Sequence, residues 1–187
     1  MNALSISGKS WISKTFNEED VLFIKENFIL DSTISKLLSI RKIKKEDINS
    51  FLNPSIKNFL PNPNSLIDME KSTKRTIDAI NQKEKIGIFG DYDVDGATSA
   101  AMISSYLEDC GCQTYIHIPD RFLEGYGPNE QALKSLYDKG SELIITVDCG
   151  ISSFEPLKAM TKVNLDLIVI DHHIPDQVLP PAYAIIN

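Results

Sequence analysis

The second half of the chain alternates short apolar runs with segments of helical length, and this alternation leaves few possible architectures. The apolar runs are rich in Ile, Val and Leu and are too short for helices, so we expect each to be a buried strand. Strands that alternate with helices predict an α/β fold with a parallel sheet flanked by helices. We expect strands at 85–89, 113–118, 142–147 and 165–170, helices at 97–110, 129–139 and 152–162, and a last strand pattern at 183–187.

The first 83 residues lack such strands and show helical patterns instead. We expect helices at 17–29, 32–39, 45–52 and 65–83, with prolines between the last two that mark a linker. The sequence therefore predicts a small helical N-terminal region with a linker helix, 1–83, and an α/β domain, 84–187. Because no terminator or polar tail follows the last strand pattern, we expect this domain to be incomplete at its C-terminus.

Acidic or imidazole side chains directly follow three of the expected strands. Gly90–Gly96 (GDYDVDG) follows the first strand, Asp148–Gly150 the third, and Asp171–His173 the fourth. In an open parallel sheet the carboxyl ends of the strands line one crevice, where ligands bind. Carboxylates and imidazoles are ligands for divalent cations, and two cations about 3.5–4 Å apart promote phosphate-ester hydrolysis. The residues alone indicate metal-assisted hydrolysis of a phosphate ester or anhydride.

Each of these motifs alone has a more ordinary explanation. An Asp-x-Asp after a strand is often a helix cap or a loop acid, and Asp148 before a helix is equally consistent with an N-cap. A His pair is commonly a packed or capping element. Their joint occurrence favours a metal site, because the chain has three histidines and two of them lie here. The third, His117, lies inside an expected strand, and we expect it to be structural.

Four segments, in their order and spacing, resemble the motifs of the DHH phosphoesterase superfamily in the form found in its RecJ branch. They are Gly90–Gly96, Ile118–Gly127, Thr146–Gly150 and Asp171–His173. The resemblance extends over roughly residues 30–187 and implies a DHH domain that is truncated here. One position departs from many DHH relatives, in which a histidine stands where this chain has Phe89. That departure agrees with the RecJ branch and makes the first metal dependent on a downstream acid.

RecJ-like proteins degrade single-stranded DNA from the 5′ end with manganese or magnesium, releasing nucleoside 5′-monophosphates in recombination and repair. The resemblance implies a cytoplasmic 5′–3′ exonuclease with a two-metal site. It implies single-stranded DNA as the substrate of the full-length protein, a single-strand-binding protein and a helicase as partners, and no membrane association. Since RecJ-like proteins continue with another acidic ligand and a domain that grips nucleic acid, we expect this N-terminal fragment to be inactive by itself.

The motif match also implies a role for each site residue. The metal ligands are Asp93, Asp95, Asp148 and His172, the catalytic residues Asp91, Asp171 and His173, and the substrate-binding residues Arg121, Tyr126 and Gly127. Asp171 is expected to hold a histidine tautomer. Three roles stay open: Arg121 binds phosphate or pairs with Asp120 or Glu124, Tyr126 stacks on a base or packs in its loop, and His173 binds metal or faces the scissile phosphate.

The charge of the chain is unevenly distributed. The net charge is −7, with +3 in residues 1–86 and −10 in residues 87–187. An acidic catalytic domain needs basic surface from elsewhere to hold DNA. The one dense basic run, Arg41–Lys45, is more simply a solvated helix end than a DNA contact. Three cysteines without a disulfide or zinc pattern indicate reduced, cytosolic thiols.

Two further functions compete with the exonuclease. One is another DHH phosphoesterase, acting on short oligonucleotides, cyclic dinucleotides or pyrophosphate by the same chemistry; the helical N-terminal region disfavours it. The other is a non-catalytic DHH-type replication scaffold, which is disfavoured because none of the motifs is degraded. A dinucleotide-binding fold is disfavoured because no Gly-x-Gly-x-x-Gly follows the first strand.

Overall fold

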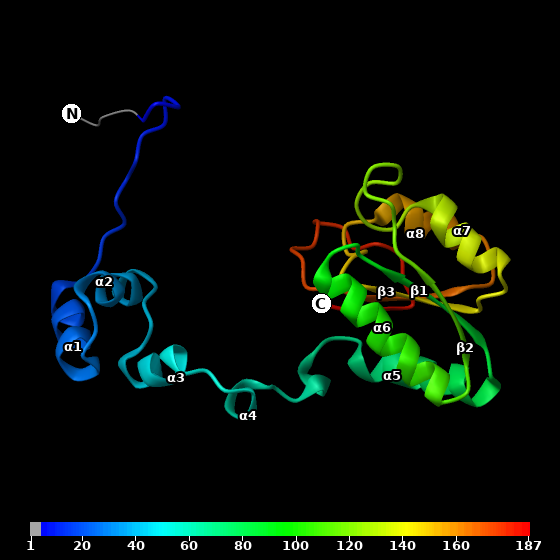
Figure 1. Cartoon of the computed structure of the whole chain (residues 1–187), viewed down its shortest axis with the longest axis horizontal. Coiled ribbons are helices and arrows are strands. Elements are labelled where there is room, and N and C mark those ends of the chain that lie inside the picture. The colour runs from blue at the N-terminus through cyan, green and yellow to red at the C-terminus, as the bar shows by residue number, and fades with distance from the viewer. Residues whose placement is uncertain (1–4) are drawn as a thin grey trace. The chain divides into compact units, whose positions relative to one another are not determined.

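The computed structural model describes residues 5–187 (Figure 1). The chain divides into two compact units, Met1–Pro61 and Asn62–Asn187. Residues 1–4 of the predicted helical region lie outside the described residues. The sequence-based boundary after residue 83 stays a prediction about domain organisation. In the described part of the chain, every helix is too short or too polar to cross a lipid bilayer.

The N-terminal unit consists of short helices, and the first two begin at a side-chain cap. They are α1 (Glu18–Phe28), α2 (Ser32–Ile40), the 3₁₀ helix η1 (Lys45–Asp47), α3 (Ile48–Leu52) and α4 (Ile56–Phe59). Asn17 caps α1, since its Oδ1 accepts the backbone N–H of Glu19 at 2.8 Å. Asp31 caps α2 by accepting the N–H of Thr33 at 2.7 Å. A small core holds the helices together and consists of buried Ile24, Leu38 and Ile48.

The second unit is an α/β domain, as the sequence predicts. Its elements are η2 (Pro63–Ser65), α5 (Met69–Gln82), β1 (Lys85–Gly90), α6 (Val94–Asp109), β2 (Gln113–His117), α7 (Glu130–Asp138), β3 (Leu143–Val147), α8 (Phe154–Met160), β4 (Asp166–Ile170) and β5 (Ala184–Ile186). The five strands form one sheet in the order β2-β1-β3-β4-β5, and all neighbouring pairs are parallel. Every residue of β3 is buried, as expected for a central strand covered on both faces.

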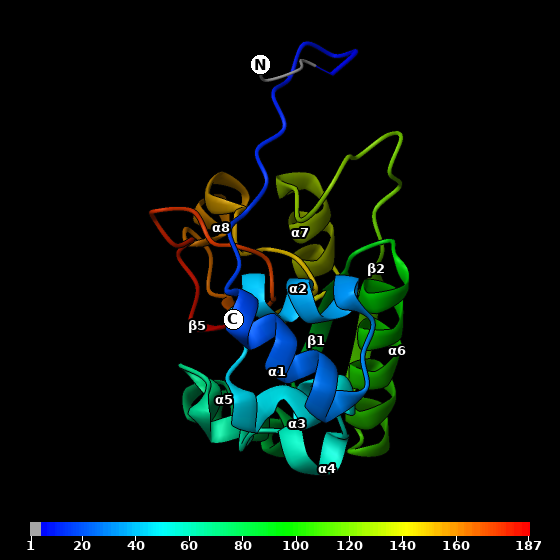
Figure 2. The same cartoon turned by 90° about the vertical axis from the view of Figure 1, so that its left-hand side faces the viewer.

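Helices cover both faces of this sheet (Figures 1 and 2). On one face, Ala79 of α5 and Leu107 of α6 pack against Ile86, Ile145 and Ile168 of the strands. On the other face, α7 and α8 pack side by side, and their buried side chains meet the alternate residues of the same strands. The period of two along each strand therefore supplies both apolar layers.

Polar contacts join α5 to the sheet. The Arg75 guanidinium bonds Glu84 at 2.7 Å and Asp166 at 2.5 Å, so it ties the helix to the start of β1 and of β4. At the other end of α5, the Asp68 carboxylate accepts the backbone N–H of Ile185 at 3.0 Å. The Asp68 bond helps to hold the edge strand β5 in the sheet although this strand has only three residues.

Candidate metal centre

The carboxyl ends of β1, β3 and β4 lie side by side, and each is followed by an aspartate at the same level. Asp91, Asp148 and Asp171 each donate the backbone N–H to the carbonyl oxygen of the last residue in the neighbouring strand, at 3.4, 2.9 and 2.9 Å. Between β1 and β3 the strand order reverses, because β2 lies on the other side of β1. α/β sheets bind ligands at such a switch point.

Asp93 and Asp95 lie where α6 begins. The sequence predicts this helix from residue 97, after both acids, but the helix starts at Val94. Asp93 is its N-cap and accepts the N–H of Gly96 at 3.0 Å. Asp95 is therefore in the first helical turn and exposed, and it is not among the acids whose carboxylates converge. The two side chains diverge because a helix turns about 100° per residue.

Gly96 allows the helix start to approach the strand end. A Cβ at this position would lie 2.5 Å from the backbone N and O of Asp91, closer than real Cβ contacts come. Only glycine permits this approach, which brings the Asp93 side chain to the rim of the sheet.

The converging side chains form two groups that share one residue. Asp91, Asp93 and Asp148 make one group, and Asp148, His172 and His173 make the other. Within each group the candidate ligand atoms lie within 4.8 Å of one another. A shared carboxylate between an oxygen-rich group and a histidine-containing group has the form of a site for two divalent cations.

Asp148 has an unusual backbone and a crowded side chain. Its φ is +61°, in the left-handed region that costs free energy for a residue with a Cβ. Burial raises the pKa of its carboxyl, and the neighbouring Asp93 raises it further. Oδ1 lies 3.1 Å from His172 Nε2. A cation here would offset the repulsion between the carboxylates.

Asp91 provides a direct test of whether the residues fit a metal. It is 3% exposed, and its buried Oδ1 has no hydrogen-bond partner among the described residues. A buried carboxylate oxygen without a donor is costly unless a cation satisfies it. Asp91 therefore fits a metal-binding role as well as the catalytic role predicted from its motif.

Asp171 positions His173 rather than His172. Its Oδ1 lies 2.7 Å from His173 Nδ1 and also accepts the backbone N–H groups of both histidines, while Oδ2 accepts the N–H of Ile151 at 3.0 Å. Burial alone would raise the pKa of this carboxyl, but these hydrogen bonds outweigh it and the net shift is downward. The bond to Asp171 raises the pKa of His173. The aspartate stays ionised and fixes the ring.

The loop before α7 brings two predicted substrate-binding residues to this rim. The Tyr126 hydroxyl lies 3.3 Å from His173 Nδ1, and the two rings meet edge to face. The Arg121 guanidinium lies over the Tyr92 ring at 4.8 Å and has no ion pair among the described residues, although the sequence allowed one with Asp120 or Glu124. Gly127 has φ +76° within the same loop.

Other residues at the site were not predicted from the sequence. Tyr92 supports Arg121, and Ile151 donates to Asp171 through its backbone. Tyr92 could have been predicted, because it is the middle residue of the Asp-Tyr-Asp motif. The Ile151 donor could not, because no side-chain pattern indicates a backbone donor. His117, predicted to be structural, stacks on Phe89 at 5.3 Å and bonds Glu124 at 2.9 Å.

An α/β sheet with carboxylates and histidines at three adjacent strand ends is the arrangement that the DHH-like motifs of the sequence predict. The family model described as "DHH family, N-terminal domain" matches residues 85–187. The chain therefore belongs to the DHH family, and within it the chain is RecJ-like.

The relatives are much longer than this chain. It is 37% identical over 178 residues to the single-stranded-DNA-specific exonuclease RecJ of Bacillus subtilis, covering 95% of the chain and 22% of that protein. RecJ of Haemophilus influenzae is 37% identical over 137 residues, 73% of the chain and 24% of the relative. A crystal structure of exonuclease RecJ bound to manganese matches with 32% identity and a TM-score of 0.59, over 64% of this chain and 31% of that one. The chain thus spans less than a quarter of the curated relatives' length.

Proposed function

We propose that this chain carries the metal-dependent catalytic site of a single-stranded-DNA exonuclease that acts in the 5′–3′ direction in recombination and repair. The observation that carries the proposal is the pair of ligand groups that share Asp148. The specificity of the two RecJ relatives for single-stranded DNA supports single-stranded DNA as the substrate. Hydrolysis of the phosphodiester would release nucleoside 5′-monophosphates.

The proposed cofactors are two manganese or magnesium ions. Bound cations of this kind supply a nucleophilic hydroxide and stabilise the negative charge of the transition state. Asp93 and Asp148 would hold them with His172, and buried Asp91 supplies a further oxygen. Asp95, in the first turn of α6, is the predicted ligand with the least geometric support. An imidazole in the set favours manganese over magnesium.

The chain's own residues would bind and orient the phosphodiester. Asp171 holds His173 in one orientation, and Tyr126 contacts the same ring, so His173 is fixed at the rim. Arg121 lies flat on Tyr92 with no competing ion pair in the described part of the chain, and its guanidinium fork suits a phosphate. These contacts favour the phosphate-facing role for His173 and the phosphate-binding role for Arg121.

The experiment uses a chimera, because the chain spans 22% of the Bacillus subtilis relative. This chain replaces the matching segment of that protein, and single strands labelled at the 5′ or the 3′ end are incubated with manganese. We expect mononucleotides to be released first from the 5′ end, and Asp148→Asn to abolish release. Preferred cleavage of dinucleotides or pyrophosphate would favour another DHH phosphoesterase, and no cleavage by a folded chimera would favour a scaffold.

The proposed setting is the cytoplasm. Its support is the free state of Cys110, Cys112 and Cys149, since thiols persist in reducing compartments. A single-strand-binding protein and a helicase are the proposed partners. Retention of either protein on the immobilised chimera, and its loss after removal of this segment, would test them.

A further inference from the structure

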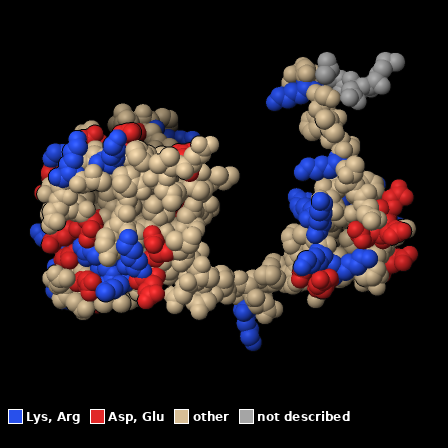
Figure 3. All heavy atoms as spheres, turned by 180° about the vertical axis from the view of Figure 1, so that it is seen from behind, with Lys and Arg blue, Asp and Glu red and all other residues tan. Residues whose placement is uncertain are grey.

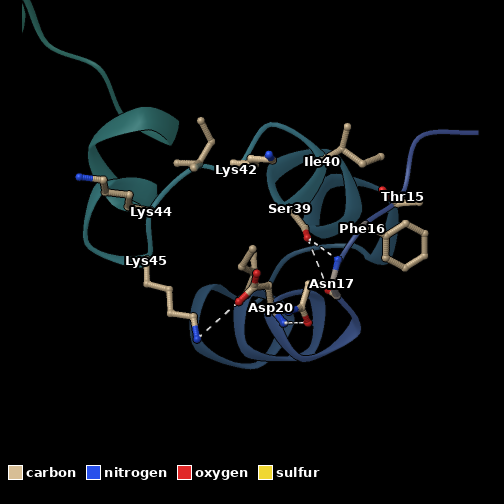
Figure 4. A pocket seen from close by; sticks show the side chains of 11 residues that line it. Thr15, Phe16, Asn17, Asp20, Ser39, Ile40, Lys42, Lys44 and Lys45 are labelled. Atoms are coloured by element: carbon tan, nitrogen blue, oxygen red, sulfur yellow. Dashed lines mark hydrogen bonds and ion pairs between the residues drawn. The ribbon is translucent and has the colours of Figure 1, made fainter.

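The N-terminal unit contains an open pocket of about 630 Å³ between the start of α1 and the segment that follows α2 (Figure 4). The side chains that line it include Phe16, Ser39, Lys42, Lys44 and Lys45. Lys45 pairs with Asp20 at 3.6 Å, whereas Lys42 and Lys44 form no ion pair within residues 5–187. The basic run is therefore more than the solvated helix end that the sequence suggested, because three of its lysines line a concave surface.

Lys42 occupies a position that usually belongs to glycine. α2 ends in a Schellman motif, in which the N–H of Lys42 bonds Ser39 O at 2.9 Å and the N–H of Ile43 bonds Leu38 O at 3.2 Å. The φ of Lys42 is +55°, a conformation that a Cβ disfavours. The side chain of this strained residue lines the pocket.

The two units differ in charge. Residues 5–61 carry nine Lys or Arg and seven Asp or Glu, whereas residues 62–187 carry ten and nineteen. Figure 3 shows the basic side chains of the smaller unit gathered mainly on one side and most of its acidic ones on the other. The helical unit is therefore a more favourable surface for binding a polyanion than the acidic α/β domain.

We propose that this pocket binds the backbone of a single-stranded nucleic acid. Lys42 and Lys44 would contact phosphates, and Phe16, whose side chain is 40% exposed, would take a base against its ring. Surfaces that bind single-stranded nucleic acids combine basic side chains with exposed aromatic rings. An acidic peptide would require only the lysines. The choice of nucleic acid as the ligand rests on the proposed nuclease function.

The test separates strain from charge with two glycine substitutions. Lys42→Gly relieves the left-handed backbone and removes the ammonium group, while Ile29→Gly relieves the same kind of strain, at φ +52° after α1, outside the pocket. Both variants of the full chain should melt at a higher temperature than the wild type. Only Lys42→Gly should weaken binding of a fluorescent oligothymidylate of about ten nucleotides, by roughly fivefold near 50 mM salt. Its log–log salt slope should fall by about 0.7.

Binding is measured by fluorescence anisotropy with EDTA present, which prevents metal-dependent cleavage. The binding result is then separate from any test of the proposed nuclease activity. Lys25→Ala controls for net charge, since it removes one exposed cation from α1. Equal weakening by Lys25→Ala and Lys42→Gly would overturn the pocket in favour of general attraction. Unchanged binding by Lys42→Gly, or no binding by the wild type, would overturn it as well. Displacement of the oligonucleotide by polyglutamate at equal charge would identify an acidic peptide as the ligand instead.

Discussion

Asp148→Asn should make the metal-free protein more stable and the manganese-bound protein less stable than the wild type. Asparagine keeps the shape of the side chain and tolerates the φ of +61°. It removes the repulsion from Asp93, whose candidate ligand atom lies within 4.8 Å. Because Asp93 is exposed, solvent screens this repulsion, and we expect the metal-free variant to gain a small amount of stability.

Metal reverses the order of stability. A ligand at a hundredfold excess over its Kd stabilises the folded state by about 2.7 kcal/mol. The wild type should gain this in manganese, and the variant should gain little because Asp148 belongs to both ligand groups. For a domain of this size, each kcal/mol shifts the melting temperature by about 2–4 °C.

Thermal unfolding followed by circular dichroism, in EDTA and in manganese, measures both effects. The control is Asp138→Asn, which removes an exposed carboxylate paired with Lys134 on α7. That control should change neither curve by more than about 0.5 kcal/mol. A variant that is less stable than the wild type in EDTA, or one that keeps the full manganese shift, would refute the crowded-carboxylate explanation.

Three other perturbations test separate parts of the structure. Arg75→Ala should cost about 3–5 kcal/mol in urea unfolding because Glu84 would stay buried without its partner, and a loss below 1 kcal/mol would show that the pair is dispensable. Gly96→Ala should cost about 1–3 kcal/mol and reduce the manganese shift, since its Cβ would collide with the backbone of Asp91; an unchanged shift would contradict the close approach. Arg121→Ala in the chimera should impair cleavage and keep the manganese shift, and wild-type kinetics would remove Arg121 from substrate binding.

Local sequence patterns predicted which strand ends form the site, because each pattern spans only a few residues. A buried β-branched run followed by Asp148 can be recognised without tertiary information, and so can the rim that parallel strands share. The exact start of α6 was missed, because whether Asp93 caps the helix depends on the space that Gly96 leaves beside the strand end. Because α6 starts three residues earlier than expected, Asp95 lies in its first turn and its side chain is directed away from the other acids.

The pocket of the N-terminal unit was not predictable from local patterns. It depends on a contact between segments 22 residues apart, in which the N–H of Asn17 bonds Ser39 Oγ at 3.1 Å. No periodicity encodes that contact, and the basic run alone looks like many solvated helix ends. The left-handed conformation of Lys42 was equally hidden, because the sequence shows lysine where a helix end normally has glycine.

The central claim is that the strand ends hold two divalent cations through a shared Asp148. The most direct measurement is the number of manganese ions bound per molecule of the chimera, which supplies the expected downstream acid, from the loss of the free-ion signal in electron paramagnetic resonance titrations. We expect two ions for the wild type, one for His172→Ala, which alters only the histidine-containing group, and none for Asp148→Ala. The same number of bound ions in the wild type and in Asp148→Ala would contradict the claim.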